Sequence, residues 1–521
     1  MTYDIVVCGA GHNSLITACY LARAGYEVLV LESRDVAGGG AVTEELSTPG
    51  FRFDSCSTGH TLIQPNPVLR DDELGLKRDF GLEYVQPDPV AHVVFPDGEH
   101  FTHWLDLDRT LDEIATFSRR DADTYKRALD EFAEIRGPLG QYRFNPIGYV
   151  PPLDDLLRDK PRWVRRIAMT SYDVVMHTYE DPHVQAYVLW QAFQTAQPVD
   201  SPGSGLLAYS IVAGRQSSSW TLPLGGSGEL ARALVDCLHA AGGELRCGVR
   251  VAELVVENGR CTGIVTDAGE RIGAGRAVVS TIHVKKLVEM APGDAWGDDF
   301  LDGVGTYDAG ISTFAQYYAT TEAPQFVGDR TAVSAGVVGW PHDVLQAGRD
   351  LRAGGFLRGR WLLVATPTLV DPSRAPEGQH TVKLLGMAPW HGGDWPDDLK
   401  ASVARENLDA LCRAAPNMAR DGVILSEYVK SPVDVERHNE HMWHGTIHGG
   451  DRSWPNDGPR RPVPGWAQHR MPIAGLYQTG ATTHPGGSIT GAPGRNCAVV
   501  LLEDLGHDIK EVVGGAAAGR A

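Results

Sequence analysis

Glycines and one carboxylate near the N-terminus are spaced as a dinucleotide-binding site requires. An apolar run, Asp4–Cys8, leads directly into Gly9-Ala10-Gly11-His12-Asn13-Ser14. Glu32 stands 21 positions after Gly11, at the end of a second apolar run. A carboxylate at this place accepts hydrogen bonds from both ribose hydroxyls and disfavours a ribose 2′-phosphate. These residues therefore predict binding of a dinucleotide other than NADP.

The elements that position these residues follow in the order of a Rossmann unit. Residues 4–8 predict a buried strand, the Ala- and Leu-rich run that ends at Gly25 predicts a helix, and Glu27–Leu31 predicts a second strand. Gly9 permits the tight turn, and Gly11 lets backbone N–H groups approach a pyrophosphate at the positive end of the helix. Ser14 occupies the third glycine position of the pattern, which affects helix–strand packing more than phosphate binding.

A second glycine cluster follows the acid and narrows the type of dinucleotide. It reads Ala37-Gly38-Gly39-Gly40-Ala41-Val42-Thr43. In this place after the terminal acid, the cluster favours FAD as the ligand. A stretch close to the C-terminus, Gly475–Gly480, again predicts a strand that ends in glycine and a return of the chain to the same site.

Composition limits the class of protein. The chain has 521 residues, which predicts two connected domains, and its 42% hydrophobic content is ordinary for a globular protein. The net charge of −19 argues against a nucleic-acid partner and against charge-driven binding to anionic lipid, while a peripheral hydrophobic membrane contact stays open. No apolar run reaches the length of a membrane span and the chain starts with a core strand, so we expect no leader peptide and a cytoplasmic location.

Cysteine spacing excludes two further kinds of chemistry. The eight cysteines are scattered and form no CxxC or CxxxxC pair. The flavin disulfide-reductase mechanism is therefore not expected, and neither is a metal cluster.

Nucleotide-binding and substrate-binding character alternate along the chain. We predict an α/β fold in which a Rossmann-type FAD-binding domain is interrupted by insertions, and these insertions form a substrate domain with a mixed sheet and helices. The FAD-binding domain is assigned to residues 1–80, 220–305 and 465–510, and the substrate domain to residues 81–219 and 306–464. Residues 511–521 are rich in small side chains and predict a disordered tail.

Five segments resemble the phytoene dehydrogenase-related flavoproteins. This group includes carotenoid desaturases, carotene ketolases of desaturase-like sequence and pyridine nucleotide-disulphide oxidoreductase domain-containing proteins. The matching segments are Gly9–Asn13, Glu32–Glu45, Pro223–Gly226, Ser431–Glu436 and Gly480–Asn496. The resemblance implies FAD and the two-domain fold, and it specifies the substrate poorly.

The resemblance also implies roles for individual residues. Around the pyrophosphate and adenosine it places Gly9, Ala10, Gly11, His12, Asn13, Glu32, Ser33, Arg34 and, through its backbone at the adenine, Val251. Along the flavin side it places Gly38, Gly39, Gly40, Ala41, Val42, Gly480, Ala481, Gly487, Ser488 and Ile489. Ala481 replaces an acid found in many relatives, which puts one ribityl hydrogen bond in doubt.

Three side chains are candidates for chemistry beside the flavin. His484 and His60 are histidines that could act as a base or orient a substrate, because a histidine titrates near neutral pH. Arg495 could neutralise a phosphate or a substrate carboxylate. Each has a structural alternative, a backbone-bonded histidine or a salt bridge.

Two other clusters favour structural interpretations. His438, His441, His444 and His448 lack the spacing and the additional ligands of a metal shell, so we predict a loop or cavity rim and no metal. Aromatic residues at Trp163, Tyr172, Tyr187, Trp190 and Phe193 could line an apolar tunnel, but core packing is favoured for each.

The leading functional hypothesis is an FAD-dependent oxidoreductase that takes a hydride from a largely apolar small molecule. Only one dinucleotide signature is visible in the sequence, so O2 or a quinone fits as the electron acceptor. Three alternatives remain open: a flavin amine oxidase, a regulatory flavoprotein without catalysis, and a redox-neutral isomerase that uses reduced flavin.

Overall fold

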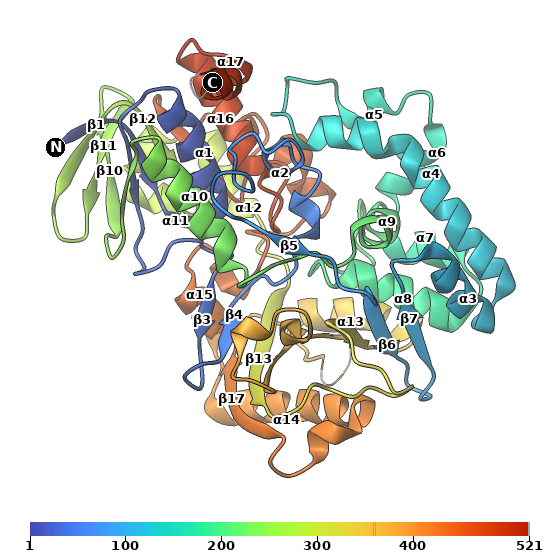
Figure 1. Ribbon diagram of the computed structural model, residues 1–521. Coiled ribbons are helices and arrows are strands. Elements are labelled where there is room, and N and C mark those ends of the chain that lie inside the picture. The colour runs from blue at the N-terminus through green and yellow to red at the C-terminus, as the bar shows by residue number, and fades with distance from the viewer. Residues whose placement is uncertain (358, 360, 519–521) are drawn as a thin grey trace.

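Two seven-stranded sheets organise the protein. The computed structural model describes residues 1–357, 359 and 361–518, and within them the sheet orders are β10-β11-β12-β1-β2-β9, with β18 paired to β12, and β17-β13-β16-β15-β14-β6-β7. The first sheet lies at the upper left of Figure 1 and the second at the bottom, with a helical region to the right. The α/β fold with a mixed second sheet is the fold predicted from the sequence.

The first sheet is built around β1 (Thr2–Cys8), which has a parallel strand on each edge. Its apolar half is buried because both faces are covered: Ile5 and Val7 pack in one apolar cluster, and Val6 and Cys8 in another. Val6 pairs with Leu29 of β2 and with Val278 of β12. The other bounds in this sheet are β2 (Val28–Leu31), β9 (Glu244–Arg246), β10 (Val251–Glu257), β11 (Arg260–Thr266), β12 (Arg271–Ser280) and β18 (Leu476–Gln478).

Helices from three distant parts of the chain pack against this sheet (Figure 1). They are α1 (His12–Arg23), α10 (Gly228–Ala240) and α16 (Ala492–Asp504). Leu15, Leu234 and Leu501 belong to one buried apolar cluster. The first sheet and the helices that cover it are therefore assembled from segments far apart in the chain.

The second sheet carries the other wall of the site. Its strands run antiparallel except for the parallel pair of β14 and β6, where Gly336 lies opposite Val93. Helix α14 (Asp397–Ala414) packs against it through Leu411 and Ala410. The strand bounds are β6 (Ala91–Val94), β7 (His100–His103), β13 (Ser312–Thr320), β14 (Ser334–Val337), β15 (Leu362–Ala365), β16 (His380–Ala388) and β17 (Ile424–Lys430).

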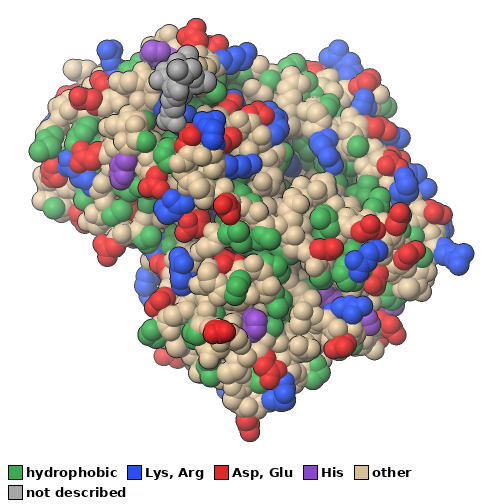
Figure 2. Space-filling view, in the orientation of Figure 1, with side chains coloured by type: hydrophobic (Ala, Val, Ile, Leu, Met, Phe, Trp, Pro, Cys, Tyr) green, Lys and Arg blue, Asp and Glu red, His purple; other side chains and the backbone are tan. Residues whose placement is uncertain are grey.

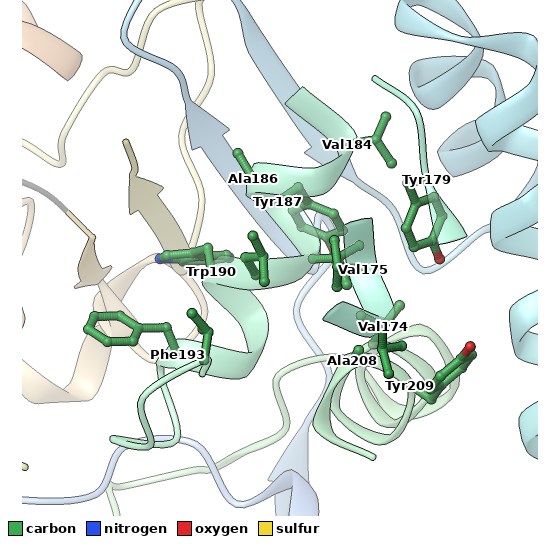
Figure 3. Close-up of a cluster of buried hydrophobic side chains, with 14 of the residues drawn as sticks. Val174, Val175, Tyr179, Val184, Ala186, Tyr187, Trp190, Phe193, Ala208 and Tyr209 are labelled. Atoms are coloured by element: carbon green, nitrogen blue, oxygen red, sulfur yellow. The ribbon is translucent and has the colours of Figure 1, made fainter. Parts of the chain in front are cut away.

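The helical region spans residues 107–218 and has its own core. The helices are α3 (Leu107–Phe117), α4 (Arg119–Arg143), α5 (Leu153–Leu156), α6 (Pro161–Ala168), α7 (Ser171–Thr178), α8 (Pro182–Phe193) and α9 (Leu207–Ser218). Figure 3 shows Tyr187, Trp190 and Phe193 extending from α8 into this core, which also contains Trp163. Tyr172 packs against its edge. These aromatic residues are core residues, as favoured from the sequence.

Side-chain caps divide two long helical stretches of this region into separate helices. The span 111–136 belongs to α3 and α4, because the side chain of Ser118 accepts a hydrogen bond from the Asp121 N–H and begins a new helix. The span 163–179 belongs to α6 and α7, and Thr170 caps α7 in the same way.

The C-terminal segment differs from the predicted disordered tail. Helix α17 covers Ile509–Ala518, and Ile509 and Val512 are buried in the cluster that contains α1 and α16. The spacing of these two apolar residues places them on one helix face, which gives the segment a surface to bury. Residues 519–521 of the predicted tail lie outside the described part of the chain.

Short elements complete the molecule. Their bounds are α2 (Pro67–Arg70), α11 (Val284–Leu287), α12 (Asp298–Thr306), α13 (Pro341–Arg352), α15 (Pro432–His438), β3 (Thr43–Glu45), β4 (Arg52–Asp54), β5 (Tyr84–Val85) and β8 (Leu222–Pro223). Acidic and basic side chains are interspersed over the face seen in Figure 2. Among the described residues, no helix has both the length and the apolar character needed to cross a bilayer.

Candidate active site

A cavity of about 700 Å³ is lined by residues from both sheets and from the helical region. One end, the turn end, lies where β1 and β2 finish, and is formed by Gly9, Gly11, His12, Asn13, Glu32, Ser33 and Arg34. The other end, the α8–α9 end, is formed by Gln191, Gln194, Thr195, Ile211, Gly214, Arg215, Trp220, Leu363 and Ala365. The carboxyl edge of a parallel sheet is where α/β proteins bind ligands.

The glycine turn after β1 leaves backbone N–H groups at the cavity wall. Gly9 has φ +97°, and a Cβ there would lie 2.4 Å from Thr281 Cγ2, so the fold itself requires glycine. At Gly11 the nearest atom to a Cβ would be Ser14 Oγ, at 4.0 Å. No side chain of the described residues caps the N-terminus of α1. The first-turn N–H groups therefore lack a helical partner and suit an anion such as pyrophosphate.

Ser14 shows how the third glycine of the pattern is replaced. Its hydroxyl donates to the carbonyl oxygen of Gly9 at 2.6 Å and lies 2.9 Å from the carbonyl oxygen of Gly11. The side chain is fully buried. It therefore closes the turn from behind, on the side away from the space that a phosphate would occupy.

The carboxylate of Glu32 is held in place by the turn that precedes it. Its Oε2 accepts a hydrogen bond from the Ala10 N–H at 2.8 Å, and its Oε1 accepts from the Arg34 N–H at 3.0 Å. Ser33 Oγ lies 3.4 Å from Oε1. Each carboxylate oxygen can accept a second hydrogen bond, so capacity for ribose hydroxyls remains. Val251, at the start of β10, lines the same end of the cavity.

The second glycine cluster packs directly on the turn. The Gly38 N–H donates to the Ala10 carbonyl at 2.7 Å, and Gly38 has φ +129° with only 2.3 Å between a Cβ and the Ala41 carbonyl oxygen. Gly39 and Gly40 line the cavity. Gly38, Ala41 and Val42 lie behind them, so they support the wall without forming it.

The C-terminal return closes the cavity from the opposite side. Gly480, Ala481, Ser488 and Ile489 line it. Gly480 has φ +92°, and a Cβ there would lie 2.5 Å from Thr281 Oγ1. Gly487 lies behind the lining, where a Cβ would be 2.5 Å from the Cα of His448. Three segments that are far apart in sequence thus meet around one space.

Polar atoms at the turn end fit a bound dinucleotide. His12 Nε2 and Asn13 Oδ1 are buried and have no hydrogen-bond partner among the described residues. Buried polar atoms are usually satisfied, and an external ligand is one way to satisfy them. The uncapped helix offers N–H donors that suit an anionic pyrophosphate, and the carboxylate of Glu32 offers acceptors that suit ribose hydroxyls, so the polarity of this end is compatible with a dinucleotide such as FAD.

The three residues expected to do chemistry lie outside the cavity lining. His484 is buried, its Nε2 donates to the Tyr142 carbonyl at 3.1 Å, and burial lowers its pKa to about 4. His60 bonds through Nε2 to Ser227 Oγ at 2.7 Å. Arg495 makes a bidentate ion pair with Glu73, with N–O distances of 2.7 and 2.8 Å. The contacts of His484 and Arg495 match their structural alternatives, whereas the ring of His60 bonds to the side-chain hydroxyls of Ser227 and Tyr84 and not to the backbone.

The histidine-rich segment supplies cavity residues that sequence reasoning placed only at a rim. His441 and His448 line the cavity, and burial lowers their pKa values to about 4 and about 3, so both rings are neutral at pH 7. His438 also lines the cavity, and its Nε2 lies 3.0 Å from a carboxylate oxygen of Glu44, while His444 stacks on Trp443 outside the lining. The four histidines therefore have different surroundings, and no group of three metal-binding side chains forms within the described residues.

Strands of the second sheet add mostly apolar wall together with one lysine. Ala315 and Tyr317 of β13 and Leu385 of β16 line the cavity. Lys383, also on β16, donates to the carbonyl oxygens of Asp54, at 3.1 Å, and of Cys56. Burial lowers the pKa of its ammonium to about 8. Neither Lys383 nor Arg215 stood out in the sequence, because only tertiary packing brings them to the cavity.

Comparison with known proteins places this site in context. The family model for flavin containing amine oxidoreductases matches residues 15–500. Pyridine nucleotide-disulfide oxidoreductase domain-containing protein 2 of Mus musculus is 28% identical, with 96% of this chain and 94% of that protein covered. One of the subunits of limonene dehydrogenase from Castellaniella defragrans is 28% identical, covering 97% and 95%. A lycopene-forming phytoene desaturase of Paracoccus sp. is 24% identical, covering 96% and 97%.

Solved structures share the fold. An oxidoreductase from Methanosarcina mazei matches with a TM-score of 0.58 at 17% identity, covering 97% of this chain and 100% of that chain. A triple mutant of putrescine oxidase matches with a TM-score of 0.64 at 13% identity, covering 97% and 98%. Both likenesses extend over nearly the whole of this chain.

Proposed function

Because the chain belongs to the family of flavin containing amine oxidoreductases, we propose that its cavity holds FAD at the turn end and oxidises an apolar small molecule at the α8–α9 end. The protein is an FAD-dependent oxidoreductase, in keeping with its dehydrogenase and desaturase relatives. The observation that carries the assignment of the two ends is the continuity of one cavity from the glycine turn to the second sheet.

Different residues of the cavity bind different parts of the cofactor in this proposal. The N–H groups that follow Gly11 bind the pyrophosphate, and Glu32 binds the adenosine ribose while held by Ala10. Gly39, Gly40, Gly480 and Ser488 lie along the flavin half. When bound, the flavin supplies the acceptor for a hydride.

At the α8–α9 end, the protein positions the substrate and excludes water. Apolar side chains of Ile211, Leu363, Ala365 and Leu385 line it, so an apolar substrate displaces little ordered water. Holding a substrate C–H bond in one orientation beside the cofactor is the main rate contribution expected from such a wall. None of His484, His60 and Arg495 is assigned a role in this step.

Electron transfer out of the reduced protein is proposed to go to O2 or a quinone. The sequence has a single dinucleotide signature, which FAD occupies in this proposal. A peripheral membrane contact would give access to a quinone and to apolar substrates, and flotation with liposomes tests this contact. Stopped-flow reoxidation with O2 and with a soluble quinone separates the two acceptors.

The test of function begins with the visible spectrum of the purified protein. We expect bound FAD, and anaerobic bleaching of the flavin by at least one member of a panel of carotenoids, retinoids, steroids, phenolics and amines. Bleaching by amines alone would favour the amine oxidase alternative. Bound FAD that no compound reduces would favour a regulatory flavoprotein, and activity only after prior reduction would favour an isomerase. Protein that stays free of FAD after reconstitution would refute the proposal.

A further inference from the structure

A buried arginine lies at the α8–α9 end of the cavity. Arg215, on helix α9, is 6% exposed and lines the cavity. Its guanidinium lies near two indole rings, 5.6 Å from the centre of Trp190 and 5.7 Å from that of Trp220. Contact with both rings restricts the plane of the guanidinium, so the directions of its N–H groups are restricted as well.

The positive charge of Arg215 has no acidic partner in the described part of the chain. Its Nη2 donates to Gln194 Oε1 at 3.0 Å and its Nη1 to Ser334 Oγ at 3.5 Å, which are neutral acceptors and use two of five N–H groups. By contrast, the buried Arg374 is paired with Asp54 at 2.6 Å. Buried charges are normally paired, and Arg215 departs from this rule.

Gln194 adds a second unused donor at the same place. Its oxygen accepts from Arg215, which turns its Nε2 group away from that arginine, and Nε2 is buried without a partner among the described residues. Gln194 lines the cavity beside Arg215. A guanidinium and a carboxamide N–H group therefore stand together at the cavity wall, close to the apolar side chains of this end. Donors of this kind bind oxygen atoms that carry negative charge.

We propose that Arg215 and Gln194 bind a carboxylate of the substrate, so that the oxidoreductase acts on apolar molecules that carry one carboxylate group. The inference rests on the proposed function, since it names the substrate class of the same cavity. A carboxylate monoanion balances the charge of Arg215, which has only neutral hydrogen-bond partners in the described part of the chain. A protonated amine would meet repulsion from Arg215, so the site opposes cationic substrates.

The charge of Arg215 persists over the working range of pH. Burial lowers its pKa to about 10, which is still far above neutral pH. A carboxylic acid with an ordinary pKa is ionised above about pH 5. An ion pair between Arg215 and a substrate carboxylate can therefore form between these limits.

The first experiment uses the wild-type holoprotein and three probes of equal chain length: decanoate, decanol and decylammonium. Perturbation of the flavin absorption spectrum and isothermal titration calorimetry report their binding. We expect decanoate to bind on the order of 10-fold more tightly than decanol, and decylammonium to bind most weakly. Equal binding of decanoate and decanol, or a preference for decylammonium, would overturn the proposal whatever the variants do.

Variants then assign the preference to the two side chains. Arg215→Met should remove the preference for decanoate and leave decanol binding within about threefold, while Arg215→Lys should retain part of it. Gln194→Met should weaken decanoate only. The matched control is Arg349→Met, because Arg349 is exposed and lies outside the cavity lining. This variant should keep the wild-type preference for decanoate. A full preference in folded Arg215→Met would refute the assignment.

Failure of this inference can be told apart from failure of the proposed function. FAD content and flavin reduction are measured on the same preparation. Protein that lacks FAD, or whose flavin no compound reduces, contradicts the proposed function. Protein that holds reducible FAD but shows no preference for decanoate contradicts only the role of Arg215 and Gln194.

Discussion

The backbone N–H of Ala10 donates a hydrogen bond of 2.8 Å to the carboxylate of Glu32. This contact joins the turn after β1 to the end of β2. The acid that is expected to bind the ribose therefore also holds the turn that is expected to bind the pyrophosphate. Loss of the acid should affect both parts of the cofactor.

Replacing Glu32 by alanine should weaken FAD binding by about 1.5–3 kcal/mol, because charge-assisted hydrogen bonds to the ribose are lost. This corresponds to an increase in Kd of roughly 10- to 150-fold, measured by titrating apoprotein with FAD and following flavin fluorescence. Glu27→Ala is the matched control, since Glu27 is exposed and outside the cavity lining. Unchanged affinity in Glu32→Ala would mean that the nucleotide site is wrongly assigned.

Alanine at Gly9 and alanine at Gly11 should have different consequences. Gly9→Ala combines a positive φ with a contact of 2.4 Å to Thr281, so we expect the apoprotein to lose at least about 1–3 kcal/mol of unfolding free energy. Gly11→Ala meets no close atom of the described residues, so the apoprotein should lose less than about 1 kcal/mol. FAD affinity should nevertheless fall about 10-fold or more in Gly11→Ala, because the methyl group occupies cofactor space. Urea unfolding and FAD titration separate the two effects, and equal stability losses would contradict the turn geometry.

Arg495 and Glu73 should behave as a structural pair. Each side chain is 13% exposed, and Tyr20 also donates to Glu73, so the pair is partly desolvated and well bonded. Arg495→Ala should lower the unfolding free energy by about 1–3 kcal/mol, and Glu73→Ala by a similar amount. A double-mutant cycle should show that the two losses are not additive. The rate of flavin reduction per folded molecule of Arg495→Ala should stay within about threefold of the wild-type rate. A much larger loss would indicate that Arg495 takes part in catalysis.

Lys383 should make stability depend on alkaline pH. Its folded pKa is about 8 and its unfolded pKa about 10.4, so between these values the unfolded chain binds more protons at this residue. Unfolding free energy should therefore rise with pH over this window, by up to about 3 kcal/mol from this residue. The slope is measured as the difference between wild type and Lys383→Met in urea unfolding at about pH 7.5, 8.5 and 9.5, which cancels other groups. If wild type and Lys383→Met show the same dependence of unfolding free energy on pH, burial does not lower the pKa of Lys383.

Much of the fold and the cofactor end of the site could be predicted because backbone constraints are local. The positive φ of Gly9 and Gly38 requires glycine at those positions. An acid at the end of a strand is likewise recognised from a few adjacent residues of the sequence. The discontinuous Rossmann unit, the mixed second sheet and FAD were therefore predicted correctly. Of the turn residues, Gly9, Gly11, His12 and Asn13 line the cavity, and their binding of the cofactor stays a prediction.

Side-chain direction and long-range packing could not be predicted in the same way. His484 follows closely after Gly480, which lines the cavity, yet its ring packs on Tyr142. Arg215 belongs to α9, and its guanidinium lies near Trp190 of α8 and Trp220 of the segment after α9. The sequence of α9 alone does not reveal these neighbours, so it could not predict that the arginine is buried. The disordered tail was mispredicted for a related reason, since Ile509 and Val512 are stabilised by helices from both ends of the chain.

The pairing of β18 with β12 has a consequence for biosynthesis. Residues 476–478 complete the sheet, and the loop that follows supplies Gly480 and Ile489 to the cavity wall. A nascent chain that has emerged only as far as β17 carries the glycine turn and Glu32 but an open flavin side. The complete cavity wall can therefore form only after the last segment has left the ribosome. Truncation within this segment would also remove part of the first sheet and the buried residues of α16, so it would disturb the fold together with the site.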